Sequence, residues 1–117
     1  GIYWGSFFNH QVANIYIEEN RWEDIMKMIE ETPSLKILDQ FRDQLGTKYL
    51  EKYIELYEQC VRKYMIDNTG RSHYKIAAGY LKLLKKLGAN ERAKIIAQEW
   101  REKYPRRPVM QEELRGL

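Results

Sequence analysis

The sequence has 117 residues, 44% of them hydrophobic and 32% charged, which allows one compact core and is too short for two ordinary domains. The aromatic content of 13%, with only seven Gly and three Pro, excludes a disordered or collagen-like chain. No apolar run approaches the roughly 20 residues of a membrane-spanning helix, and no signal peptide is recognisable. We therefore expect a single domain over residues 1–117, with no membrane partner.

The formal net charge of +3 hides an uneven distribution. Residues 1–70 carry 8 Lys and Arg against 12 Asp and Glu, a balance of −4, whereas residues 71–117 carry 12 against 5, a balance of +7. A basic half attracts anionic partners such as nucleic acid or an acidic protein surface. It also pairs with an acidic half of the same chain, or forms a plain solvated surface, and the sequence leaves these alternatives open.

Four helices are predicted in the first part of the chain, where apolar residues recur at helical spacing and no two-residue alternation is sustained. They cover about 9–18, 22–31, 35–45 and 48–67. Three of them have an expected N-cap residue: Asn9, Ser34 and Thr47. Pro33 ends the second helix, and Gly46 is expected at the C′ position that follows the third.

Three more helices are predicted after a loop at residues 67–70, whose composition is typical of turns. They cover about 73–87, 91–104 and a short segment that begins at Pro108. Ser72 and Asn90 are their expected N-caps, and Gly88 ends the first of the three. The small residues at 77–79 are expected to let a neighbouring backbone approach.

Six to seven short antiparallel helices with brief connections predict an all-α fold. We favour a right-handed α-solenoid stack similar to tetratricopeptide repeats, with an irregular bundle as the alternative. The segment from Tyr74 to Pro105 has Gly after its first helix and Pro after its second, as those repeats do. It departs from them in that small Ala97 and bulky Trp100 occur in the reverse order of size. No second copy of the 34-residue pattern appears upstream.

The sequence offers no visible carrier of catalysis. Cys60 lies in the middle of a helix on its apolar stripe, where a buried core cysteine is expected in preference to a nucleophile or redox sensor. A single cysteine supplies neither an internal disulfide nor a multi-thiolate zinc site, which fits a reducing, cytoplasmic compartment. His10 and His73 lack metal-ligand spacing. We expect no enzyme activity, no cofactor and no metal site in this chain.

Basic residues form the first candidate binding site. Lys75, Lys82 and Lys86 are spaced to share one helix face, Lys85 stands beside them, and Arg106-Arg107 lies between two prolines as a possible anion clamp. Phosphate contact is one interpretation, and structural capping or ion pairing is the other. The aromatic residues near this charge are expected on inward stripes, which weakens a single-strand-binding interpretation.

The second candidate site lies at the N-terminus, which is apolar for a free end. Its members are Tyr3, Trp4, Phe7 and Phe8. We expect them to pack on this domain or on a missing part of a longer protein, or else to form a partner surface.

A series of local motifs runs through the downstream two-thirds of the chain. They are Pro33-Ser34-Leu35, Tyr53 to Tyr57, Arg71-x-x-Tyr74-x-x-Ala77-Ala78-x-Tyr80-Leu81, Trp100-Arg101-x-x-Tyr104, Arg106-Arg107-Pro108 and Glu112-Glu113-Leu114. With them, residues 33–117 resemble the C-terminal helical region of bacterial SWIM zinc-finger proteins. The Cys-x-Cys and Cys-x-His pairs of that family have no counterpart here, so the resemblance implies a zinc site upstream and no metal ligand in this chain.

Two functions follow as expectations. The first is a non-catalytic helical scaffold that binds a protein or another domain of its own chain. The second is an auxiliary nucleic-acid-binding module that uses the basic C-terminal half without reading bases.

Overall fold

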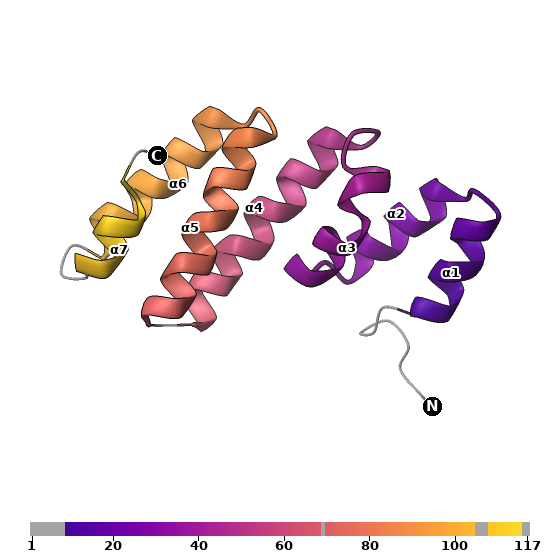
Figure 1. Ribbon diagram of the computed structural model, residues 1–117, viewed down its shortest axis with the longest axis horizontal. Coiled ribbons are helices and arrows are strands. Elements are labelled where there is room, and N and C mark those ends of the chain that lie inside the picture. Colours follow the sequence, from indigo (N-terminus) through magenta and orange to yellow (C-terminus); the bar gives the residue numbers. More distant parts are fainter. Residues whose placement is uncertain (1–8, 69, 105–107, 116–117) are drawn as a thin grey trace. The chain divides into compact units, whose positions relative to one another are not determined.

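The computed structural model describes residues 9–68, 70–104 and 108–115, which form seven helices and no strand (Figure 1). The helices are α1 (His10–Glu18), α2 (Trp22–Glu31), α3 (Leu35–Leu45), α4 (Leu50–Asp67), α5 (Arg71–Lys86), α6 (Asn90–Lys103) and α7 (Pro108–Glu113). The predicted all-α fold of six to seven helices is confirmed. None of the helices in these ranges has the length and apolar character needed to cross a bilayer.

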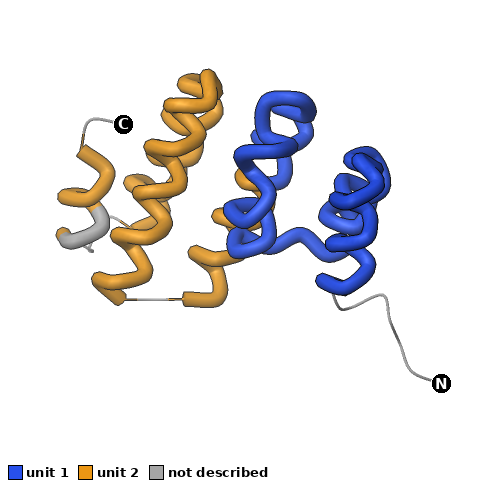
Figure 2. The backbone as a smooth tube through the Cα atoms, turned by 45° about the vertical axis from the view of Figure 1, so that its right-hand side comes forward, with its two compact units in different colours: residues 1–56 blue, residues 57–117 orange. Residues whose placement is uncertain are grey.

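The chain divides into two compact units, residues 1–56 and residues 57–117 (Figure 2). Helix α4 begins in the first unit and ends in the second. The expectation of a single domain stays a prediction.

The first unit packs α2 between α1 and α3, and the start of α4 adds further contacts. Its buried side chains are Ala13, Ile25, Met26, Ile29, Leu38, Phe41, Leu45, Tyr53 and Leu56. Tyr53 is fully buried, and its hydroxyl donates a hydrogen bond of 3.1 Å to the carbonyl oxygen of Leu38 in α3. On the surface, Lys52 of α4 forms an ion pair of 3.0 Å with Glu30 of α2. The unit is therefore held by an apolar core to which α4 adds the buried hydrogen bond of Tyr53.

The predicted caps are confirmed at two helices and wrong at three. Asn9 and Ser34 accept hydrogen bonds of 3.1 Å from the backbone amides three residues ahead, as N-caps do. Helix α4 begins at Leu50 and not at residue 48, so Thr47 does not cap it. Ser72 and Asn90 lie inside α5 and α6, since those helices begin at residues 71 and 90 without a side-chain cap.

The two glycines that follow helices behave differently. Gly88 has a φ of +99°, the left-handed conformation that suits glycine after α5, as predicted. Gly46 is right-handed at φ −62°, which contradicts the expected C′ role. A Cβ atom at Gly46 would lie 2.5 Å from the carbonyl oxygen of Arg42, so the position needs glycine for space.

The second unit arranges alternate helices side by side. Helix α5 packs against both α6 and α7, and two ion pairs join α4 to α6. Helix α4 also contacts α5, because the ring centres of Tyr57 and Tyr80 lie 5.7 Å apart. The buried side chains are Tyr57, Val61, Met65, Tyr74, Ala77, Ala78, Leu81, Leu84, Ala93, Ile96, Ala97, Trp100 and Leu114. The α-solenoid stack, the irregular bundle and the repeat type stay predictions.

The end of the second unit is fastened to α6 by side-chain to backbone hydrogen bonds. Arg101 donates a bond of 2.7 Å to the carbonyl oxygen of Leu114, and Gln111 donates one of 3.1 Å to that of Tyr104. Leu114 itself is fully buried. Helix α7 is short, and these contacts hold the segment around it in place.

Candidate functional site

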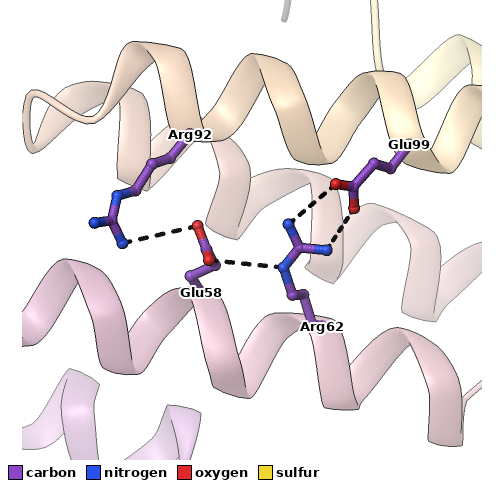
Figure 3. A network of polar contacts seen from close by, with 4 residues as sticks. All are labelled: Glu58, Arg62, Arg92 and Glu99. Atoms are coloured by element: carbon purple, nitrogen blue, oxygen red, sulfur yellow. Dashed lines mark hydrogen bonds and ion pairs between the residues drawn. The ribbon is translucent and has the colours of Figure 1, made fainter.

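A chain of charged side chains crosses from α4 to α6 (Figure 3). Arg62 donates two hydrogen bonds to the carboxylate of Glu99, and its Nε atom lies 3.7 Å from Glu58. Arg92 approaches the other oxygen of Glu58 at 3.9 Å. The hydrogen bond from Arg62 lowers the pKa of the Glu99 carboxyl and raises that of the guanidinium.

This α4–α6 network balances its own charge, because it contains two carboxylates and two guanidinium groups. Two of its pairs, Arg62 with Glu99 and Arg92 with Glu58, join the acidic part of the sequence to the basic part. Only the pair of Arg92 with Glu58 joins a cation of the basic part to a carboxylate of the acidic part; in the pair of Arg62 with Glu99 the cation comes from the acidic part and the carboxylate from the basic part. A network that is already neutral offers little attraction to a charged ligand.

Helix α5 is different, because it holds five basic residues and no acidic one. Arg71, Lys75, Lys82 and Lys86 are all exposed. At i, i+4, i+11 and i+15 they follow one side of the helix over about 22 Å. With the residues that the structure describes, none of the four forms an ion pair. We call them the basic row.

The four predicted lysines of α5 are all exposed, and three of them form no ion pair with the described residues. Lys75, Lys82 and Lys86 belong to the basic row, whereas Lys85, which stands three residues after Lys82, is exposed and has interactions of its own. Arg71, which the sequence interpretation did not place among the site residues, extends the row by one turn.

An apolar strip runs beside the basic row on the same helix. It consists of Ile76, which is 46% exposed, exposed Gly79 and half-buried Leu83. Gly79 stands three or four residues from Ile76, Lys75, Lys82 and Leu83, which makes it the centre of this surface. A Cβ atom added at Gly79 would meet no heavy atom within 4 Å. The basic row and the apolar strip together form what we call the α5 face.

The expectation for the small residues 77–79 is therefore only partly met. Ala77 and Ala78 are buried against neighbouring helices, but Gly79 points to the outside. Sequence reasoning missed Ile76 and the outward position of Gly79. The spacing contained the signal, because Gly79 lies four residues after Lys75 and three before Lys82, on the lysine side of the helix.

The aromatic residues near the basic charge lie inward, as expected. Tyr74 and Trp100 are 7% and 4% exposed, so neither offers a ring for base stacking. Tyr104 is half-buried, with the Nζ atom of Lys103 5.6 Å from its ring centre.

The candidate residues Cys60 and His73 contact other parts of the second unit or are partly buried in it. Cys60 is half-buried, somewhat less than the core position expected for it, and burial raises the pKa of its thiol, which disfavours the reactive thiolate. The Nδ1 atom of His73 lies 2.6 Å from the hydroxyl of Tyr64, so this histidine contacts α4 within the unit. Among the described residues, no three His, Cys, Asp or Glu side chains are grouped to hold a metal ion.

Six predicted site residues lie outside the described residues. They are Tyr3, Trp4, Phe7, Phe8, Arg106 and Arg107.

No family model, curated protein or solved structure matches this chain. The resemblance to the helical region of SWIM zinc-finger proteins accordingly stays a prediction, as does the upstream zinc site that it implies.

Proposed function

We propose that this chain is a non-catalytic helical scaffold that binds an acidic protein surface through the α5 face. The observation that carries the proposal is the contrast between two surfaces of the second unit. The charges of the α4–α6 network pair with one another, whereas the basic row is exposed and unpaired among the described residues. Unpaired charges of one sign attract a partner of the opposite sign and orient its approach.

The apolar strip favours a protein over a phosphate backbone. Exposed Ile76 and half-buried Leu83 gain from contact with apolar side chains, which nucleic-acid backbones lack. Interfaces between proteins combine an apolar centre with polar residues at its edge, and on the α5 face the basic row borders the apolar strip on one side. A cytoplasmic location is part of the proposal, since the single cysteine fits a reducing compartment.

Nucleic-acid binding remains the second candidate, because the basic row is also suited to track phosphates. Its length of about 22 Å spans several phosphates of one strand. In that function Lys75, Lys82 and Lys86 contact the backbone without reading bases.

Fluorescence anisotropy separates the two candidates. The probes are labelled poly-glutamate and labelled single- and double-stranded DNA, each at two salt concentrations. The proposed function predicts that poly-glutamate binds and that Lys82→Glu weakens this binding, whereas Lys94→Glu on α6 does not. Tighter binding of DNA than of poly-glutamate, with a steep loss on added salt, would support the second candidate instead.

A further inference from the structure

The position of Gly79 is unexplained by the packing of the chain itself. A glycine inside a helix costs about 0.5–1 kcal/mol relative to alanine. Gly79 is not left-handed, it is exposed, and an added Cβ would touch nothing within 4 Å. Neither backbone conformation nor internal space therefore requires glycine at this position.

A glycine on a helix surface lets another backbone approach closely, because no side chain holds the two apart. The gap left by the missing side chain of Gly79, which we call the low point of the α5 face, lies between two kinds of residue. Lys75 and Lys82 flank it on one side, and Ile76 and Leu83 flank it on the other. A partner segment that packs over Gly79 thus contacts positive charge on one side and apolar side chains on the other.

We propose that the α5 face binds an amphipathic helix of a partner protein that has acidic residues beside its apolar stripe. This inference rests on the proposed function and specifies the partner. The helix crosses α5 over Gly79, with its apolar stripe on Ile76 and Leu83 and its carboxylates toward Lys75 and Lys82. Helix pairs pack about 8–10 Å apart, and small residues at the crossing point give the shorter distances.

Charge selects the partner, since five basic residues and no acidic residue occur on α5. A basic or neutral helix gains nothing from the basic row. The apolar strip selects a helix over an extended acidic chain, because only a regular stripe at i, i+3 and i+7 matches Ile76, Gly79 and Leu83. The aromatic residue nearest to the apolar strip is Tyr80, which is half-buried with its ring centre 5.7 Å from that of Tyr57 in α4, so its ring is already in contact within the unit.

The test uses two labelled peptides of equal composition, each of about 18 residues, or five helical turns. In the first, Leu recurs at i, i+3, i+4 and i+7 with Glu on its flanks. In the second, the same residues are shuffled so that no stripe forms. The protein is titrated as wild type and as Gly79→Leu, which fills the low point with a good helix former and leaves the charge unchanged.

The inference predicts that the striped peptide binds at least about tenfold more tightly than the shuffled one, a difference of about 1.4 kcal/mol. Gly79→Leu removes this preference for the striped peptide, and Lys82→Glu weakens the binding of both peptides. The matched controls Gln98→Leu and Lys94→Glu, at exposed positions of α6, leave both affinities unchanged. Far-UV circular dichroism confirms that each variant keeps its helical content.

Different outcomes would overturn the proposed acidic-surface function and the proposed helical partner. Equal binding of both peptides that is weakened by Lys82→Glu but not by Gly79→Leu overturns the helix partner and leaves the acidic-surface function standing. Dimerisation of the wild type that Gly79→Leu abolishes overturns the partner protein in favour of a second copy of the chain. Absence of binding by both peptides and by poly-glutamate overturns the proposed function together with the inference.

Discussion

Replacing Gly79 with alanine should make the protein more stable. The magnitude follows from two properties of the position. Glycine in a helix interior is less favourable than alanine by about 0.5–1 kcal/mol, and the added methyl group meets no heavy atom within 4 Å, so no clash reduces this gain. We expect the free energy of unfolding to rise by about 0.5–1 kcal/mol, and the melting temperature by roughly 2–5 °C.

Urea unfolding followed by far-UV circular dichroism measures this effect. Gly88→Ala is the matched control, because the same methyl group is added where φ is +99°. There the left-handed backbone should cost about 1–2 kcal/mol. A loss of stability in Gly79→Ala would refute the reasoning, since it would mean that Gly79 packs inside the chain and is not available to a partner.

Four further predictions concern side chains away from the α5 face. Tyr53→Phe should cost about 1 kcal/mol, because it removes a buried hydrogen bond, while Tyr49→Phe one turn earlier should cost less in the same urea assay. Burial raises the pKa of Tyr53, so the stability that it contributes is full below the ordinary tyrosine pKa of about 10 and declines at higher pH; an equal alkaline loss in Tyr53→Phe would contradict this. A double-mutant cycle of Arg62→Ala and Glu99→Ala should give a coupling below about 1 kcal/mol that shrinks with salt, and a coupling insensitive to salt would be inconsistent with an exposed pair. Alkylation of Cys60 by iodoacetamide at pH 7 should be slower than that of an unstructured cysteine peptide, because burial raises the pKa of its thiol, and equal rates would show that the thiol is open.

Helical periodicity and chain breakers were sufficient to predict the number and order of the helices. Pro33 and Gly88 act locally, so their effects on helix ends could be read from the sequence alone. The incorrect caps have a common cause, since a polar residue near a helix start has several possible positions. The turn from Leu45 to Tyr49 moves the start of α4 past Thr47, and such a turn has no distinct sequence signal.

The candidate site could be predicted only in part. The spacing of Lys75, Lys82 and Lys86 fixed a shared helix face, but whether those lysines find partners depends on residues distant in the sequence. Arg62 and Glu99 are 37 residues apart, and their pairing follows from the contact of α4 with α6, which no local pattern encodes. The packing of α6 and α7 on α5 likewise decides which side of α5 stays exposed.

Amide chemical-shift mapping tests the central claim most directly. The isotopically labelled protein is titrated with the striped acidic peptide, and each backbone amide reports its own change. The account predicts that the largest changes lie between Lys75 and Lys86, with Gly79 among the most affected. Largest changes at the α4–α6 network, or none along α5 at peptide concentrations that saturate the anisotropy signal, would contradict it.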